Sequence, residues 1–209
     1  MSAVKSFGLV LDLSHSGFAA VLSADAATVL ASEVRQGGTR HDDLGDWLES
    51  LLKTAGALGG WTDVAWICVG LGPGSFTGIR IAMAFAQGVA LPGKIPLYGF
   101  TSFEALFLSA KVPAVAAIAA NGGRFYLARS LDDAGVLTSA EALSAAAQGG
   151  TVLTPVAGVW DFVRIAKHAL ASKRDAHKPY YLQLSAAEDK AVADKAVADK
   201  AAADLLIPG

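Results

Sequence analysis

The sequence contains very little cysteine and little charge. Cys68 is the one cysteine among 209 residues, so no disulfide can form within the chain. It lies in the apolar run DVAWICVGL, which indicates a buried hydrophobic side chain rather than a catalytic thiol. Charged residues make up 17% of the chain and the net charge is -2. This balance predicts no broad basic surface, so any nucleic acid should reach the protein indirectly, through a partner.

The start of the chain lacks the pattern of a signal peptide or a membrane span. The segment MSAVKSFGLVLDLSHSG carries one lysine, and its apolar run is interrupted at Asp12, which makes it too short for either. We therefore expect a cytoplasmic protein with no membrane contact. Hydrophobic residues make up 53% of the chain, enough for a sizeable core in one domain or two lobes.

Three short runs favour β-structure at the beginning of the chain: Phe7–Leu13, Phe18–Ser23 and Thr28–Val34. The segments SHSG and ADAA separate them, as turns separate the strands of an antiparallel meander. Further on, Val64–Val69 is uniformly apolar, which is typical of a strand covered by helices on both faces. A mixed sheet with a helical layer is predicted.

Between the meander and this strand, the spacing of apolar residues becomes helical. Thr39 and Asp42 form a candidate capping box, and Gly56 ends the segment. The apolar face of this predicted helix consists of Leu44, Trp47, Leu48, Leu51, Leu52 and Ala55.

The second half of the chain predicts further strands and helices. We expect strands around Ile95–Tyr98, Val112–Ala120 and Phe125–Arg129, the last two joined by a turn at Asn121-Gly122-Gly123. A capped helix should begin at TSFE, Thr101 to Glu104, and further helices should lie near Ser139–Gln148 and Trp160–Ser172.

The expected organisation has two strand-and-helix lobes rather than one continuous sheet. Residues 1–100 form the first lobe, with the meander and two interface helices, and residues 101–186 form the second. Residues 187–209 repeat KAVAD with a period of five, which makes no lasting stripe on a helix and indicates a low-complexity helical tail.

The stretch VGLGPGSFTGIRIAMAFAQGVA, from Val69 to Ala90, contains five glycines but fits neither nucleotide motif. No Gly-Lys-Ser/Thr follows, as a P-loop requires, and Gly78 stands one place too late for the GxGxxG fingerprint. We expect a tight turn at Gly72-Pro73-Gly74, with Ser75 or Thr77 capping the helix that follows.

That helix is expected to be buried on nearly all sides because Arg80 is its only charge. Its small residues, Ala82 with Ala86 and Ala84 with Gly88, favour close approach of another helix. Together with the helix after Thr39, it predicts a helical-bundle interface with another subunit. The predicted interface residues are His41, Leu44, Trp47, Leu48, Leu51, Ile79, Ala82, Met83 and Ala86.

The segment GPGSFTGIRIAMAFAQGVA closely resembles the signature of the TsaB family, also called YeaZ. The signature loop consists of Gly72, Pro73, Gly74, Ser75, Phe76, Thr77, Gly78 and Arg80. The resemblance extends to the meander with Asp12, RHDDLGDWLESLL, PLYGFTSFEAL and KPYYLQ, and so covers nearly everything except the tail.

The resemblance implies a two-lobed α/β fold of the actin-like and RNase-H-like type, with mixed sheets and flanking helices. It implies a non-catalytic scaffold or dimerization subunit that supports the TsaD-type transferase in making threonylcarbamoyladenosine in tRNA, next to the anticodon. The implied assemblies are a homodimer or a heterodimer with TsaD, with a TsaE-type ATPase on the assembled pair. No cofactor is implied.

The sequence departs from the family pattern at three places. Leu13 stands where many members have threonine, Ala119-Ala120-Asn121 replaces Asp-Ala-Arg, and Arg124 replaces a glutamate. Functions of those acidic side chains are therefore not expected here.

The residues leave one enzymatic alternative open. Asp12 and Ser14 form a candidate degenerate nucleotide site, which keeps open a weak actin-like ATPase or kinase, although Asp12 alone also suits a hydrogen bond to its own turn. Neither His41 nor His168 has a histidine one helical turn later, so no metal site is predicted. Ser75 has no identifiable histidine and aspartate partners, so no catalytic residue is predicted.

Overall fold

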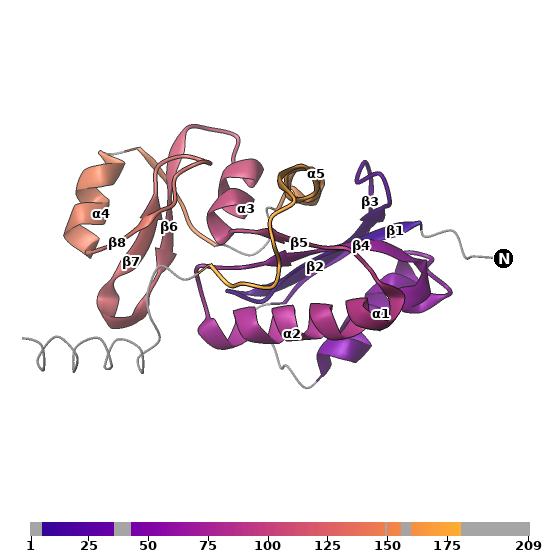
Figure 1. Ribbon diagram of the computed structural model, residues 1–209. Coiled ribbons are helices and arrows are strands. Elements are labelled where there is room, and N and C mark those ends of the chain that lie inside the picture. Colours follow the sequence, from indigo (N-terminus) through magenta and orange to yellow (C-terminus); the bar gives the residue numbers. More distant parts are fainter. Residues whose placement is uncertain (1–5, 36–42, 149, 156–159, 181–209) are drawn as a thin grey trace, which may run out of the picture.

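The structure is a computed structural model that describes residues 6–35, 43–148, 150–155 and 160–180. It contains two separate sheets that lie next to each other (Figure 1). The first has the strand order β3-β2-β1-β4-β5 and the second the order β8-β7-β6-β9. This confirms the α/β architecture with mixed sheets and flanking helices.

The first sheet begins with the predicted meander. Strands β1 (Phe7–Asp12), β2 (Gly17–Ser23) and β3 (Val29–Arg35) pair in antiparallel fashion. Strands β4 (Val64–Gly70) and β5 (Leu97–Phe100) then add in parallel to β1. The sheet is mixed because helices carry the chain back between the parallel strands.

Helices cover both faces of the first sheet. On one face lie α1 (Leu44–Thr54) and α2 (Phe76–Gly93), and on the other α3 (Ser102–Ser109) and α5 (Phe162–Ser172) (Figure 1). Successive strand residues alternate between the two cores: Leu9 and Leu11 pack towards α1 and α2, and Val10 packs towards α5. The short 3-10 helix η2 (Gly60–Asp63) leads into β4.

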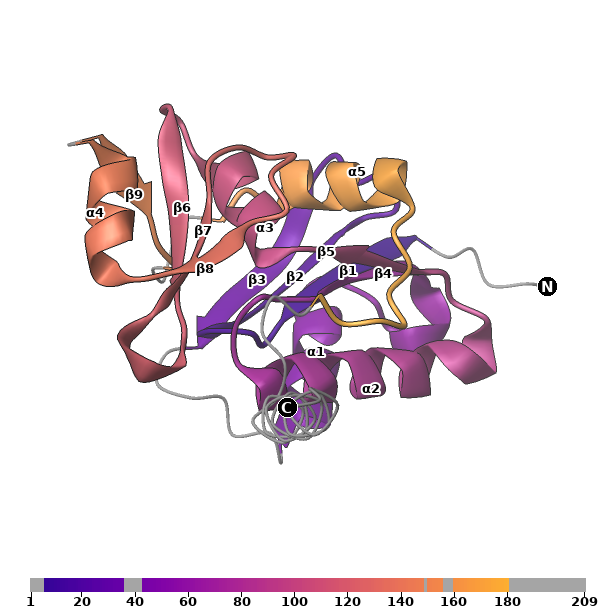
Figure 2. The same cartoon turned by 60° about the vertical axis from the view of Figure 1, so that its left-hand side comes forward.

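The second sheet is smaller. Strands β6 (Ala114–Ala119), β7 (Phe125–Ala128) and β8 (Val136–Thr138) are antiparallel, and β9 (Thr151–Leu153) is parallel to β6. Helix α4 (Ala140–Ala147) lies on the side away from α3 (Figure 2). The turn η3 (Asn121–Gly123) joins β6 and β7, and both of its glycines have positive φ, near +70°.

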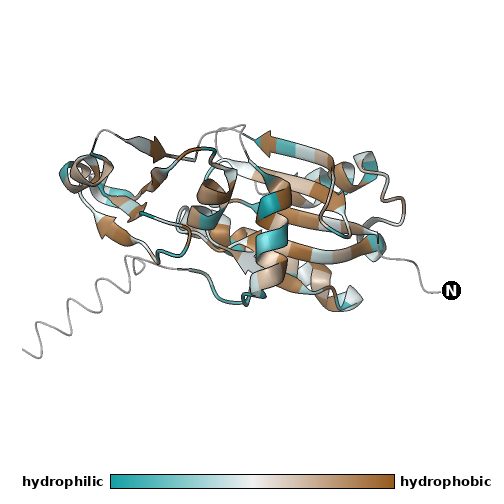
Figure 3. Ribbon diagram, turned by 90° about the horizontal axis from the view of Figure 1, so that it is seen from above, coloured by the Kyte–Doolittle hydropathy of each residue, from teal (hydrophilic) through white to brown (hydrophobic). Residues whose placement is uncertain are grey.

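Helix α5 requires a correction to the predicted division of the chain. Sequence places it in the second lobe, but its apolar residues, Phe162, Ile165, Ala166 and Ala169, are buried against the first sheet. Figure 3 looks down on this helix and shows its hydrophilic outer surface above the largely hydrophobic strands. The division near residue 100 separates the two sheets and otherwise stays a proposal.

The segment after α5 forms hydrogen bonds to β5 and to the residue that follows β4. The amide of Gly99 donates a hydrogen bond to the carbonyl of Arg174 at 3.0 Å, and the amide of Tyr180 donates one to the carbonyl of Leu71 at 2.8 Å. The Arg174 guanidinium lies 2.5 Å from the buried Glu104, whose side chain closes the predicted capping box of α3 with Thr101.

Two predicted features lie outside the described residues. They are the capping box at Thr39 and Asp42, and the tail at 187–209. Helix α1 begins at Leu44, after Asp43, whose side chain makes no capping hydrogen bond. None of the helices that the structure describes combines the length and apolar character that a membrane span requires.

Candidate functional site

The glycine loop after β4 leads directly into α2, as predicted. The Ser75 hydroxyl accepts a hydrogen bond from the Gly78 amide at 3.2 Å, which confirms Ser75 as the cap of this helix. The Ser75 amide in turn donates to the Ser14 carbonyl at 2.6 Å. The loop is therefore a turn into a helix that is fastened to the segment after β1.

Two glycines make this close packing possible. A Cβ at Gly78 would lie 1.9 Å from the carbonyl oxygen of Leu13, and one at Gly74 would lie 2.4 Å from that of Ser14. Gly72 and Gly74 also have positive φ, at 90° and 155°. Pro73 between them is buried.

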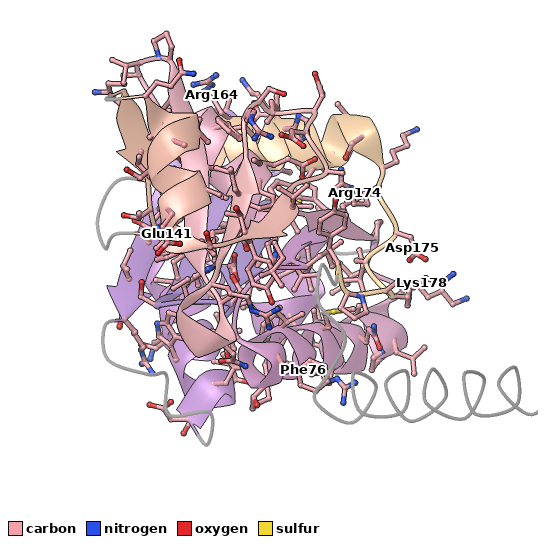
Figure 4. The ribbon with its side chains drawn as sticks, turned by 90° about the vertical axis from the view of Figure 1, so that its left-hand side faces the viewer. Phe76, Glu141, Arg164, Arg174, Asp175 and Lys178 are labelled. Carbon is pink, nitrogen blue, oxygen red and sulfur yellow. The ribbon has the colours of Figure 1, made fainter. Side chains whose placement is uncertain are left out.

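The remaining signature residues lie on the first turns of α2. The Arg80 guanidinium stacks over the ring of Phe76 at 3.8 Å, and Thr77 is exposed (Phe76 is labelled in Figure 4). These residues bring a charge and an aromatic ring to the surface at the beginning of the helix.

The candidate nucleotide site at Asp12 and Ser14 is closed from solvent. Asp12 is 3% exposed, and its carboxylate accepts the Ser14 amide at 2.6 Å, so the expected hydrogen bond to its own turn is present. Gly70 provides the space, because a Cβ there would lie 2.4 Å from the carboxyl carbon. Burial raises the pKa of Asp12 to about 6, against the lowering effect of its hydrogen bonds to Ser14.

Two residues that sequence reasoning missed complete this cluster. The Ser14 hydroxyl lies 2.7 Å from Nδ1 of His15 and 3.1 Å from the hydroxyl of Ser102, at the start of α3. Burial lowers the pKa of His15 to about 4, so its ring is neutral near pH 7. Ser102 is 88 residues from Ser14 in the sequence. The only sequence signal for its position is that it follows Thr101, the predicted cap of α3. The cluster fastens the β1–β2 turn to α3.

The structure gives no support to a metal site, a reactive cysteine or a serine nucleophile among the described residues. Within the described ranges, no group of three histidine, cysteine or acidic residues could hold a metal ion. Cys68 is fully buried, and burial raises the pKa of its thiol, which confirms it as a core residue. The Ser75 hydroxyl is engaged in capping α2.

The predicted interface residues require a correction. The helices were predicted correctly, but the eight residues that the structure describes are at most 6% exposed and pack in the chain's own core; His41 lies outside the described residues. The reason is that the apolar periodicity of each helix marks the face turned to its own sheet. The eight residues are Leu44, Trp47, Leu48, Leu51, Ile79, Ala82, Met83 and Ala86.

A second set of α2 residues faces outward instead, so the expectation of burial on nearly all sides is wrong for the single chain. Thr77, Ala84, Gly88 and Leu91 are exposed, Leu91 by 81%, and Ile81 is half-buried. We call these five residues the outer α2 stripe. Their spacing of four, three, four and three residues is the heptad spacing of helix–helix seams.

Helix α1 and the η2 turn flank this stripe. Phe85 of α2 packs edge-on against Trp61, with ring centroids 5.7 Å apart, and the Trp61 indole N–H donates to Glu49 at 3.3 Å. Asp46 and Glu49 are exposed on α1. The stripe is therefore mostly apolar, with the small residues Ala84 and Gly88 near its middle and Arg80 near its start, and the neighbouring helix α1 carries exposed acidic residues.

Residues 38–149, more than half of the chain, match the family model TsaD, described as tRNA N6-adenosine threonylcarbamoyltransferase. A 55-residue segment is 40% identical to the Escherichia coli tRNA threonylcarbamoyladenosine biosynthesis protein TsaB. The chain belongs to the TsaB (YeaZ) family and carries a TsaD-type domain. The segment amounts to 26% of the chain and 23% of the E. coli protein.

Solved structures of similar fold come from Pseudomonas aeruginosa. One, described as similar to peptidase YeaZ, superposes with a TM-score of 0.66 at 22% identity. The other, YeaZ, has a TM-score of 0.64 at 21% identity. Each match covers 85% of this chain and all of the other chain, so the two-lobed fold is shared.

Proposed function

We propose that this protein is a non-catalytic scaffold subunit in the synthesis of threonylcarbamoyladenosine in tRNA. It would bind a TsaD-type transferase and support its active arrangement, so that tRNA meets this chain only indirectly. Family membership supports the process, and the E. coli relative is named for it. The outer α2 stripe is the observation that carries the binding function.

The stripe has the chemistry of a helix-packing surface. Ala84 and Gly88 are small and exposed, and a Cβ at Gly88 would meet no atom of the described residues within 4 Å, so a partner helix has room to approach closely. Leu91 offers apolar area that the described residues leave exposed. With α1 alongside, a partner that supplies two helices would complete a four-helix bundle.

The same surface suits two assemblies, a homodimer and a heterodimer with the TsaD-type protein. A TsaE-type ATPase would then dock on the assembled pair. We place the protein in the cytoplasm, where tRNA is modified.

The alternative, a weak ATPase or kinase centred on Asp12, has less support. Its carboxyl is buried and hydrogen-bonded to the backbone of Ser14, and the residues around it fasten two segments of the fold. We infer a structural function for Asp12.

The reconstituted transfer of threonylcarbamoyl to tRNA tests the proposal. A TsaD-type protein of the same organism should show little transfer alone and full transfer when this chain is added. Asp12→Asn keeps the oxygen that accepts the Ser14 amide, so it should support transfer as well as the wild type does. Loss of transfer in an Asp12→Asn protein with a normal thermal melt would instead favour the enzymatic alternative.

A further inference from the structure

A groove lies on the opposite face of the first sheet from the outer α2 stripe. It consists of two adjoining pockets, of about 360 Å³ and 240 Å³, that share Ser109, Ala110 and Trp160. The start of β3 and the first turn of α5 border the larger pocket, and β9 borders the smaller one. We call these two pockets, with the lining residues that the structure describes, the Trp160 groove.

The floor of the groove is held by aromatic packing. The ring of Trp160 lies 4.7 Å from that of Phe18, and Phe162 packs on Phe18 at 5.5 Å, between centroids. The Ser109 hydroxyl donates to the Ala105 carbonyl and accepts the Asp161 amide at 2.9 Å. These contacts fix the floor before anything binds.

Two exposed apolar side chains line the groove. Val29 lines the larger pocket and Val152 the smaller one, and each is 37% exposed. They are two of the seven large hydrophobic residues that are exposed in the described part of the chain. Apolar side chains left exposed beside a pocket are typical of an interaction surface.

The larger pocket also carries positive charge. Lys111 and Arg164 line it, and neither side chain forms an ion pair with another described residue. Asp161, the acidic residue among the described lining, is engaged at the start of α5, where its carboxylate accepts the Arg164 amide at 2.9 Å. The groove therefore combines an apolar floor with two available cations.

We propose that the Trp160 groove binds an extended, acidic segment of a partner protein that carries apolar side chains. Two adjoining pockets that share Trp160 suit neighbouring side chains of an extended chain better than one compact small molecule. Carboxylates beside those side chains would meet Lys111 and Arg164. Two cations on a chain of net charge -2 are few for gripping a nucleic-acid backbone.

This surface is separate from the proposed TsaD contact. Figure 4 shows Arg164 near one side of the molecule and Phe76, at the start of α2, near the other, with the first sheet between them. A partner in the groove and a helical partner on α2 can therefore bind together.

A labelled synthetic peptide that alternates leucine with glutamate is the probe for this proposal, with fluorescence anisotropy as the readout. It should bind the wild type saturably, and a peptide that alternates leucine with lysine should not. Arg164→Glu should weaken binding by about tenfold or more. A glutamate is favourable in the first turn of α5, so this variant keeps the fold. Arg124→Glu, the same change at the distant β6–β7 turn, should bind like the wild type.

Matched valines test the apolar lining of the groove. Val152→Asp on β9 should weaken peptide binding, and Val136→Asp on β8, outside the groove, should not. Absence of saturable binding, or equal losses in each variant and its control, would overturn the proposal. So would a single-stranded oligonucleotide that binds there more tightly than the peptide. Association with a TsaD-type protein should persist in Arg164→Glu, which separates this test from that of the proposed function.

Discussion

At the scale of single residues, the most informative feature is a cluster of polar side chains that packs closely against glycines. Asp12, Ser14, His15 and Ser102 meet where the β1–β2 turn, the glycine loop and α3 come together. Sequence reasoning found Asp12 and Ser14 because a carboxylate just before the Ser14–Gly17 turn is suggestive of a nucleotide site. It could not find His15 and Ser102, because a lone histidine or serine gives no pattern and their contacts depend on the tertiary fold.

Asp12 predicts a pH-dependent stability. The pKa of its carboxyl is about 6 in the folded protein, against an ordinary value of 3.8, so the folded state holds this proton more tightly. This contribution to the free energy of unfolding is present below pH 4 and is lost as the pH rises through 6, by on the order of 3 kcal/mol at most. Asp12→Asn should therefore gain stability relative to the wild type between pH 4 and 7.

Urea unfolding of the two proteins across this range measures the difference. His15, whose pKa is lowered, contributes a slope of the opposite sign, but both proteins share it. A difference between wild type and Asp12→Asn that does not change with pH would contradict the assigned burial of the carboxyl.

At the scale of elements, sequence periodicity predicted where helices and strands lie but not what they face. The meander, β4, the capping box of α3 and helices α1, α2 and α5 were predicted near their observed places. The three-residue strands β8 and β9 were missed because so few residues show no alternation. The apolar residues of α1 and α2 were assigned to an interface because a pattern marks a buried face without telling which surface covers it.

Helix α2 offers a matched pair of glycines for testing how it is held. Gly78→Ala would drive a Cβ into the Leu13 carbonyl oxygen and should cost about 2 kcal/mol or more of stability. Gly88→Ala, in the same helix, meets no atom of the described part of the chain within 4 Å and should add about 0.5 to 1 kcal/mol of stability through helix propensity. Chemical unfolding of both variants measures the two effects; similar values for both would contradict the close docking of the glycine loop.

At the scale of the whole molecule, the resemblance of the signature loop to one family gave the two-lobed fold, and the comparisons confirm it. The return of α5 to the first sheet escaped prediction, because nothing local distinguishes the sheet on which an amphipathic helix packs. In the resulting molecule, the two faces of one sheet carry different surfaces. One is the outer α2 stripe beside α1, and the other is the Trp160 groove beside α5.

The central claim is that the outer α2 stripe binds a TsaD-type partner, and variants at exposed alanines test it. Ala84→Arg places a long cation in the middle of the stripe, and arginine is a good helix former, so the fold should persist. Ala145→Arg makes the same change at an exposed position of α4, in the second lobe, and serves as the control.

The most direct measurement is the molar mass by light scattering of the wild type, Ala84→Arg and Ala145→Arg, each alone and mixed with the TsaD-type protein of the same organism. We predict a one-to-one heterodimer for the wild type and for Ala145→Arg, and separate proteins for Ala84→Arg with an unchanged thermal melt. If the wild type does not associate, or if Ala84→Arg associates as well as the wild type, the account is contradicted.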